Sequence, residues 1–551
     1  MLKLLFTFLC IVGLTFYSHS QTIHLQVDIM KDSLQSSKQF TLNTFNAAEA
    51  EVKLKIDSLK RIGYPFLELD QKITDKNLLA TIRLNQKIDS LYIGINEKDL
   101  IYIPKRIKID GQKIGLAYQN IELFQKTIIE ELKAQGLSFG KSFLRDLEFK
   151  KDHALNANLV IESGLKRRID KINIKGYKSL PKSYISYLTG LKIGSEFIES
   201  RLQQKTEKLD NIPFISVKKP TEVLFKKDST ELFLYLEKFN SNTFDGFLGF
   251  GNNENSDFEL NGYLNMVLLN NLNFGERLGI IYKNDGSGQQ TFEGNIELPF
   301  VFSSPVSLGA DLRIFRRDSA FSNSAQTVEL KYYLNEKLNL KGTAEFTNST
   351  SLESENLDSV SDIENYNSSF YGIGAEFLKF GPRQLFGVNT FVKLNLSLGN
   401  RKTKNNTDQY KLTLNGQHQI NINYRNKLYL NLNSQILISN NLLNNELFRF
   451  GGVNSIRGFS ENSLLASRFA VLQTEYRYIL DTNLYANTVI DVGNYENKLI
   501  DINGNIMGYG VGIGLKSKAG VFNLIIANSV SNVQESNFSN TRIHINFTSF
   551  F

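Results

Sequence analysis

The chain changes its pattern of hydrophobic and polar positions near residue 240. From Phe244 onward, apolar and polar residues alternate in segments of about ten residues separated by turn-rich gaps, which predicts strands with one apolar and one polar face. In "KLYLNLNSQILIS", for example, Leu428 and Leu430 fall on one face while Tyr429 and Asn431 fall on the other. Sixteen such segments begin near residues 244, 256, 275, 289, 305, 323, 337, 367, 387, 409, 426, 467, 483, 506, 520 and 540.

An even number of amphipathic strands predicts a closed antiparallel β-barrel that spans a membrane, here over residues 240–551. Long polar gaps, such as Asn348–Asn367 and Gly399–Asp408, alternate with short ones, as external loops alternate with periplasmic turns. A soluble β-sandwich also alternates, but it rarely needs sixteen strands. The chain contains no tryptophan, so Tyr and Phe would have to form the aromatic girdles. The last segment, "TRIHINFTSFF", keeps four apolar residues on one face: Ile543, Ile545, Phe547 and Phe551.

Before residue 240, three diverged passages each combine strands with helices. They predict three small α/β modules, over residues 21–88, 89–166 and 167–239. In the first we expect a helix over Phe45–Arg61 after one strand and before two more. In the second we expect a strand at Arg106–Ile109, a helix over Gln119–Ala134 and two strands. The third reads as a strand, two short helices and two strands. The edges of such sheets can accept a strand from a partner.

The first 20 residues have the features of a secretory signal peptide. In "MLKLLFTFLCIVGLTFYSHS", Lys3 precedes an apolar stretch from Leu4 to Phe16 that is too short for a spanning helix. Cys10 is the only cysteine, so the mature chain would contain none. Because no other apolar segment approaches spanning length, any membrane span must consist of strands. We therefore expect a protein of the bacterial outer membrane, with its modules in the periplasm.

Composition and local motifs argue against a nucleic-acid partner and against catalysis. The net charge of +7 is not gathered into long basic runs, and the five histidines show no metal-ligand spacing. "GLSFG" at 136–140 matches a nucleophile pattern around Ser138, but the elbow requires a strand before it and a helix after it. Here a helix precedes, and Gly136 lies where that helix should end. "GKS" at 140–142 lacks the first glycine of a phosphate-binding loop. We expect no enzymatic activity, no metal and no cofactor.

One glycine-rich stretch interrupts the strands. "GGVNSIRGFSENSL", residues 451–464, lies between the eleventh and twelfth predicted strands, in a connection of roughly 30 residues that is too long for a simple turn. An arginine inside a barrel is costly unless a carboxylate pairs with it. Strand parity places Glu475 and Asp491 on the lumenal face of the next two strands, so we expect both to bind Arg457. The alternative is that they are ordinary charges of a hydrated lumen.

"SIRGF" resembles the [V/I]-R-G-[F/Y] motif of the BamA/TamA superfamily of outer-membrane assembly and translocation barrels. In that family the motif lies at the tip of a loop that folds back inside a sixteen-stranded barrel, behind tandem POTRA modules. Glu475 and Asp491 match the family positions that hold the loop arginine. The resemblance covers the whole mature chain, which is similar to TamA in size. The motif residues here are Ile456, Arg457, Gly458 and Phe459.

The resemblance implies an outer-membrane protein assembly factor. Its POTRA modules would receive unfolded outer-membrane protein clients, and its barrel would insert them into outer-membrane lipid through a weak seam between the first and last strands. These strands would be Phe244–Gly251 and Arg542–Phe551. Gly246 and Gly249 would weaken the first strand. A periplasmic or inner-membrane partner at the modules is also implied. The C-terminal signal would include two aromatic residues, Phe547 and Phe551.

A second function is open at this point: a protein-translocating pore of the two-partner-secretion type, from the same superfamily. Such a translocator carries a plug helix before its modules, for which residues 22–44 leave little room. A passive porin would not carry periplasmic modules. The sequence does not decide between insertion and translocation, and it does not name the client proteins.

Overall fold

A computed structural model describes residues 22–32, 34–150, 153–252, 258–284, 288–317, 320–352, 363–380, 388–517, 520–532 and 541–550. The predicted signal peptide, with Cys10, and the terminal Phe551 lie outside these ranges. The chain forms two compact units, one of residues up to Arg168 with Glu196–Arg201 and one of Ile169–Ser195 with Leu202–Phe551. In the described part of the chain, no helix is both long enough and apolar enough to cross a membrane.

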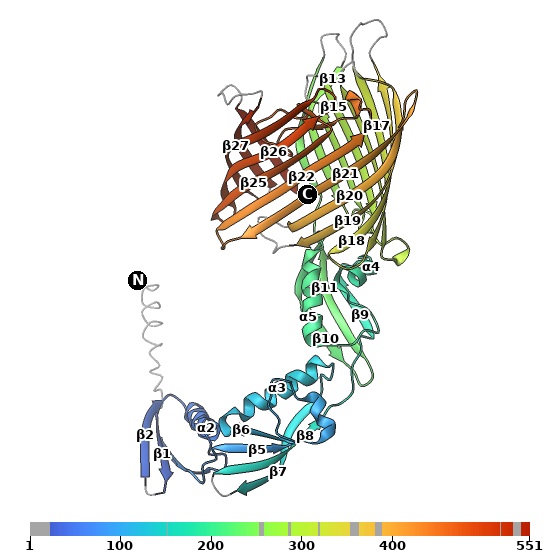
Figure 1. Ribbon diagram of the computed structural model, residues 1–551. Coiled ribbons are helices and arrows are strands. Elements are labelled where there is room, and N and C mark those ends of the chain that lie inside the picture. The colour runs from blue at the N-terminus through green and yellow to red at the C-terminus, as the bar shows by residue number, and fades with distance from the viewer. Residues whose placement is uncertain are drawn as a thin grey trace, which may run out of the picture. The chain divides into compact units, whose positions relative to one another are not determined.

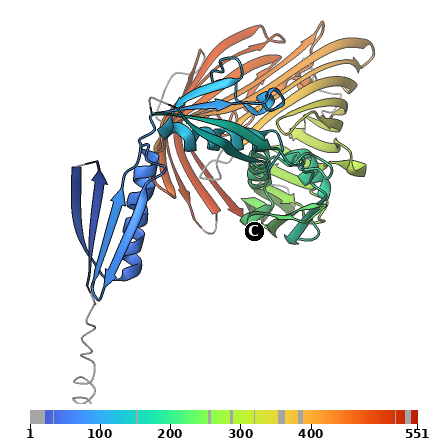
Figure 2. The same cartoon turned by 90° about the horizontal axis from the view of Figure 1, so that it is seen from below.

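The first module is a four-stranded sheet with one helix packed on a single face (Figure 2). The strand order is β2-β1-β4-β3, with β1 and β4 parallel. The helix has the bounds predicted for it, and its Val52 and Leu59 are buried against the sheet. Strand β2 was not predicted, because "LQSSKQFTL" is an edge strand with no buried face. The elements are β1 (Ile23–Lys31), β2 (Leu34–Leu42), α2 (Phe45–Arg61), β3 (Glu68–Thr74) and β4 (Asn77–Arg83).

The second module has the same plan, with strand order β6-β5-β8-β7 and α3 over the core. The strand predicted at Arg106–Ile109 is wrong, since this segment is a turn region. The segment is apolar at Ile107 because this side chain packs against the module core from a loop. The first strand is instead β5, whose Leu91 and Ile93 are fully buried. The elements are β5 (Ser90–Gly94), η1 (Glu97–Tyr102), β6 (Lys113–Ala117), η2 (Tyr118–Asn120), α3 (Ile121–Ala134), β7 (Lys141–Lys150) and β8 (Ala154–Glu162).

The third module has a three-stranded sheet in the order β10-β11-β9, with β9 and β11 parallel. Pro220 cannot donate to the ladder, and the register between β10 and β11 shifts on either side of Lys219, next to it. Strand β11 leads directly into the barrel (Figure 1). The elements are β9 (Lys171–Gly176), α4 (Lys182–Tyr184), a π-helical turn η3 (Ile185–Thr189), α5 (Glu199–Glu207), η4 (Lys208–Asn211), β10 (Ile215–Phe225) and β11 (Thr230–Lys238).

The C-terminal part is a closed barrel of 16 antiparallel strands, as predicted (Figure 1). Every predicted segment begins within four residues of an observed strand. The strands are β12 (Thr243–Asn252), β13 (Phe258–Leu269), β14 (Arg277–Asn284), β15 (Gln289–Leu298), β16 (Val306–Arg317), β17 (Phe321–Tyr333), β18 (Leu338–Ser351), β19 (Tyr366–Phe380), β20 (Val388–Lys402), β21 (Asn406–Asn421), β22 (Asn426–Ser439), β25 (Arg468–Asp481), β26 (Leu484–Asn497), β27 (Ile502–Lys516), β28 (Gly520–Ser531) and β29 (Arg542–Phe550).

The two faces of the barrel wall differ as the alternation predicts. Apolar side chains are exposed on the outside, for example Ile490 on β26 and Ile543 on β29. Polar side chains point into the lumen, where Asp491 is fully buried. An outward apolar band with a polar interior is the arrangement of transmembrane barrels.

A network of paired charges ties together the inner face of β15 to β20. Lys331 donates to Glu297 at 2.9 Å and lies 3.1 Å from Glu376, which is also paired with Lys393 at 3.4 Å. Lys341 bonds Glu329 at 3.1 Å. Because every charge in this network has an opposite partner, the wall can bury Lys331, Lys341 and Glu376 without leaving one unpaired, while the other three side chains stay partly exposed. The six residues of the network are Lys331, Lys341, Lys393, Glu297, Glu329 and Glu376.

Aromatic side chains join module 3 to the end of the barrel at which β11 enters, within one compact unit. The turns at that end are here called the module-side turns; they include Asn270–Glu276 and Pro299–Pro305. Tyr184 donates to the carbonyl oxygen of Gly275 at 2.7 Å, and its ring packs edge-on against Phe214 and Phe300. Burial raises the pKa of the Tyr184 phenol, so it stays a protonated donor.

Candidate functional site: the lumenal loop and the barrel seam

The long connection between β22 and β25 folds back into the barrel. It contains a short hairpin, β23 (Phe448–Phe450) with β24 (Leu464–Ala466), and the predicted motif lies between these two strands. Ile456 and Phe459 of the motif are buried in an apolar cluster with wall residues of β25, β26 and β27. The cluster consists of Phe450, Ile456, Phe459, Ala466, Phe469, Val471, Tyr495 and Ile506.

Arg457 at the loop tip is bound by the two carboxylates that parity selected. Its Nε and Nη2 donate to Asp491 at 2.8 and 2.5 Å, and its backbone N–H donates to the same carboxylate at 3.0 Å. Its Nη1 donates to Glu475. Arg457 is 2% exposed and Asp491 is 0% exposed. A bidentate pair with this degree of burial orients both partners and makes each of them dependent on the other.

Glycines allow the tip to touch the barrel wall. Gly458 has a φ of +90°, and a Cβ there would lie 2.4 Å from the carbonyl oxygen of Asn528. On the wall, a Cβ at Gly508 would lie 2.1 Å from the carbonyl oxygen of Arg457. Ser529 on β28 donates to the carbonyl oxygen of Gly458 at 2.9 Å. The glycine of the motif is therefore required by both its backbone conformation and this close approach.

Glu475 is shared between two arginines. Its second oxygen accepts from Arg477 Nε at 2.7 Å, and the Arg477 guanidinium lies over the ring of Tyr429. The backbone pairing of β25 with β26 is interrupted at Glu475 and resumes at Arg477. The hydroxyl of Thr474 donates to the carbonyl oxygen of Ile490 at 2.6 Å beside this gap. Glu475 therefore binds the two arginines at the point where the backbone pairing between β25 and β26 is interrupted.

A second anchor, which the sequence did not reveal, holds the first arm of the loop. Glu446 accepts from Arg401 on β20 at 2.5 Å and from Gln409 on β21 at 2.9 Å. Arg401 is 1% exposed. The neighbouring Asn445 donates to Ser349 on β18 at 2.7 Å. Glu446 is the only acidic residue between β22 and the motif, which is the signal that could have drawn attention to it.

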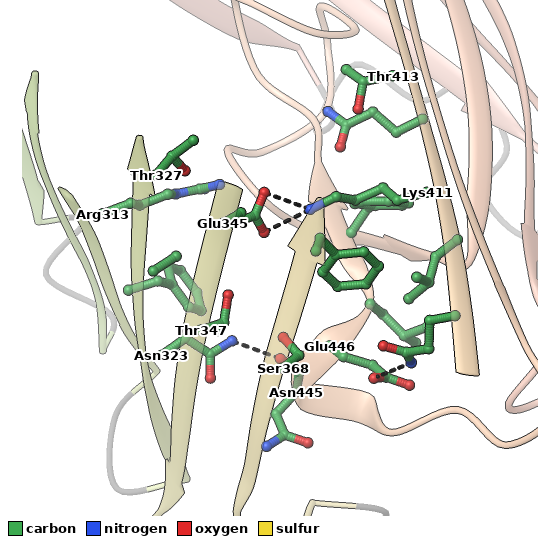
Figure 3. A pocket seen from close by; sticks show the side chains of 18 of the residues that line it. Arg313, Asn323, Thr327, Glu345, Thr347, Ser368, Lys411, Thr413, Asn445 and Glu446 are labelled. Atoms are coloured by element: carbon green, nitrogen blue, oxygen red, sulfur yellow. Dashed lines mark hydrogen bonds and ion pairs between the residues drawn. The ribbon is translucent and has the colours of Figure 1, made fainter. Parts of the chain in front are cut away.

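Beneath this arm, the lumen contains a polar cavity of about 450 Å³. Glu345 on β18 and Lys411 on β21 point toward each other across it and bind at 2.6 Å (Figure 3). Arg313 and Asn323 line the cavity on the side of Glu345, away from Lys411, and Asn323 donates to the backbone carbonyl oxygen of Asn445 (Figure 3). Positively and negatively charged side chains therefore both line the cavity next to the loop.

The seam between the first and last strands is weakly paired. Over the described residues, β12 pairs with β29 at three positions, whereas it pairs with β13 at ten. Asp245, the only charged residue of β12, accepts from Asn546 on β29 at 2.6 Å and from Tyr263 on β13. Gly246 has a φ of +153°, and Gly249 lies further along the same strand. Phe244 and Phe547, also predicted for this region, face outward and are partly exposed.

The loop tip contacts the wall on both sides of the seam. It reaches β28 through Gly458 and Ser529, and it reaches β14 through Glu461, whose carboxylate accepts from Lys283 at 2.7 Å. In the ring, β28 lies one strand before the last and β14 lies two strands after the first. Any widening of the seam therefore strains contacts made by this loop.

Removal of the cross-seam amide should loosen the seam selectively. In Asn546→Ala, Asp245 loses a partner, which for a hydrogen bond to a charged group is worth about 1.5–3 kcal/mol. We expect faster amide hydrogen exchange in β12 and β29. Asn431→Ala is the matched control, because Asn431 donates to Gln473 between β22 and β25, which pair at eleven positions. Equal exchange in both variants would contradict the special weakness of the seam.

The motif around Ser138 does not have the geometry of a nucleophile elbow. Gly136 has a φ of +83° at the end of α3, and "GLSFG" leads into a strand, so Ser138 does not sit on a nucleophile elbow. In the parts of the chain that the structure describes, no group of three or more His, Cys, Asp or Glu side chains is arranged to hold a metal ion.

Comparison with known proteins gives one family profile that matches part of the barrel and several structures that share the fold. The family profile described as "Haemolysin secretion/activation protein ShlB/FhaC/HecB" matches residues 323–515, which include the loop, Arg457 and both carboxylates. Comparison with curated proteins finds no match. The matched segment is a little over a third of the chain.

Three solved structures resemble most of the chain. BamA from Haemophilus ducreyi lacking POTRA domains 1–3 has a TM-score of 0.50 at 14% identity, covering 83% of this chain and 98% of that one. CdiB from Acinetobacter baumannii has a TM-score of 0.51 at 14% identity, covering 84% and 90%. CdiB from Escherichia coli has a TM-score of 0.52 at 12% identity, covering 92% and 97%. At these identities the likeness shows the shared fold: small α/β modules followed by a sixteen-stranded barrel.

Proposed function

We propose that this chain is an outer-membrane channel that translocates a secreted protein, of the two-partner-secretion type. The observation that carries the proposal is the haemolysin secretion/activation profile, because its matched segment contains the clamped loop. The likeness to two CdiB structures over most of both chains is consistent with it. Translocation was the alternative expectation from the sequence, and the comparisons favour it over the assembly factor.

In this proposal the modules lie in the periplasm and receive the passenger protein. Strand β2 pairs with β1 on one side only, so its other edge can accept an extended segment of the passenger. The passenger then moves through the lumen, past the cavity that Glu345 and Lys411 line. Because the loop occupies the lumen and is anchored at Glu446 and at Arg457, it must rearrange at one anchor to let a chain pass.

Insertion of outer-membrane protein clients is the second candidate, and two observations favour it. The seam has three pairs, which suits an opening toward lipid. In addition, residues 22–44, the stretch considered for a plug helix, hold the β1–β2 hairpin. Clients would then leave sideways, between β12 and β29, rather than along the lumen.

A disulfide across the seam separates the two functions. Phe244 and Ser549 are directly opposed on β12 and β29, and such positions are close enough for a disulfide. Beyond Cys10 the sequence contains no cysteine, so the modules and the barrel offer no competing thiol. If the passenger moves through the lumen, the Phe244→Cys/Ser549→Cys variant should secrete normally with and without reductant. Secreted proteins in the medium and outer-membrane protein content are the two readouts.

The control is a disulfide in the fully paired wall, Leu430→Cys/Thr474→Cys on β22 and β25. Loss of secretion in the seam variant alone, with recovery on reduction, would overturn translocation through a closed barrel. A fall in outer-membrane protein content under the same conditions would instead establish the insertion function.

A further inference from the structure

Two module-side turns expose large apolar side chains. Phe302, in the turn between β15 and β16, is 98% exposed. Phe274 and Leu272, in the turn between β13 and β14, are 68% and 62% exposed. Exposure of such side chains to water is unfavourable, and grouped apolar exposure marks an interaction site.

The backbone at Phe302 is strained, and the side chain of this residue points away from the protein. Phe300, Phe302 and Ser303 have φ values of 54°, 54° and 55°, in the left-handed region that bulky residues rarely adopt. For Phe300 the structure shows a reason, because its ring is buried between Tyr184, Tyr187 and Tyr333. The same turn holds Phe302 outward with almost its whole surface uncovered. Backbone strain of this kind persists only where the surrounding structure holds it, and it is found most often at functional sites.

The neighbouring turn is held rigid around its exposed residues. The buried carboxylate of Glu276 accepts from the backbone N–H groups of Leu272 and Phe274, at 2.6 and 3.1 Å. Asn270, also fully buried, accepts from Gly275 N–H at 2.9 Å and donates to Tyr177. These hydrogen bonds fix the backbone of the turn, so Leu272 and Phe274 are held in exposed positions.

The two turns lie side by side at the edge of the outward apolar surface. Tyr184 contacts both, through the carbonyl oxygen of Gly275 and the ring of Phe300. The strands that lead into these turns carry exposed outward apolar residues: Ile280 on β14, Ile296 on β15 and Leu308 on β16. The exposed side chains thus continue the lipid-facing surface of the barrel.

We propose that Leu272, Phe274 and Phe302 form a membrane anchor that inserts into the module-side leaflet of the bilayer around the barrel. Aromatic side chains prefer the membrane interface, and amides such as Asn271 and Asn273 in the same turn suit the headgroup level. The occupant is phospholipid at the boundary of headgroups and acyl chains. Because Tyr184 and Phe300 connect these turns to module 3, the anchor fixes the module against the membrane next to the seam side of the barrel.

The absence of tryptophan from the chain makes the test direct. Phe302→Trp supplies a single fluorescent reporter, to be measured in the full-length protein in vesicles whose phospholipids carry bromine on their acyl chains. Insertion predicts blue-shifted emission, strong quenching by the brominated lipid and protection from aqueous iodide. Phe225→Trp is the matched control, since Phe225 is partly exposed at the end of β10 far from the barrel. It should be quenched by iodide alone.

Heat-dependent electrophoretic mobility confirms that each variant is folded before fluorescence is compared. Emission from Trp at position 302 that matches the position 225 control would overturn the anchor. Protection of that Trp only after addition of a denatured outer-membrane protein would also overturn it, and would identify a docking site for polypeptide instead. Both outcomes are independent of whether the channel translocates or inserts its clients.

Discussion

Replacement of Arg457 by alanine is expected to release the loop from the barrel wall and to lower the unfolding temperature sharply. The substitution leaves Glu475 and Asp491 buried without the guanidinium that pairs them. Loss of one partner of a buried ion pair typically costs about 3–5 kcal/mol. Heat-dependent electrophoretic mobility measures the stability, and limited proteolysis between Gly451 and Leu464 measures the freedom of the loop.

Three further variants make this expectation specific. Arg457→Lys should recover little, because an ammonium cannot reproduce the fork that reaches both carboxylates. Glu475→Gln with Asp491→Asn should resemble Arg457→Ala, and the triple variant should add almost nothing. Arg313→Ala is the matched control, since Arg313 is a lumenal arginine whose pair with Glu293 is half exposed and is worth about 0–1 kcal/mol. Full additivity in the triple variant would show that the three residues do not act together.

The second large effect is expected at the junction of module 3 with the barrel. Tyr184→Ala removes a buried ring from between Phe214 and Phe300 together with the hydrogen bond to Gly275. Loss of a large buried aromatic side chain costs about 3–5 kcal/mol. We expect module 3 to detach from the module-side turns, which limited proteolysis of the connection at residues 239–242 would report.

Tyr184→Phe divides this effect into its parts. It keeps the ring and removes one hydrogen bond, so the expected loss is about 1 kcal/mol. Tyr235→Ala, on the outer face of β11, removes a tyrosine from the same module without touching the barrel and serves as the control. If Tyr184→Ala is cleaved no faster than Tyr235→Ala, the junction does not depend on Tyr184.

The barrel and the partners of the loop arginine could be predicted because strand geometry is local. A side chain on a strand faces the lumen or the lipid according to its parity, so Glu475 and Asp491 could be placed inside before their distance from Arg457 was known. The helix over Phe45–Arg61 was equally local, since its apolar residues recur at helical spacing.

Other features depend on contacts that no local pattern contains. Strand β2 is exposed along most of its length, so its sequence lacks the alternation that marks a half-buried strand. The pair of Arg401 with Glu446 joins a wall strand to a loop 45 residues away, and the fold alone decides which wall residue meets the loop. The three-position seam follows from how β12 and β29 meet when the ring closes, which neither strand specifies alone.

The paired charges of the lumen have a consequence for which polypeptides could pass in the proposed translocation. The charge network on β15 to β20 holds three lysines and three glutamates. At the loop, two arginines, Arg457 and Arg477, pair with Glu475 and Asp491. Each group sums to zero, as does the pair of Arg401 with Glu446. A constriction ringed by one sign of charge filters ions and polypeptides by their charge. Where fixed charges cancel in place, as in these three groups, acidic and basic segments of a passing chain would meet no net charge of one sign.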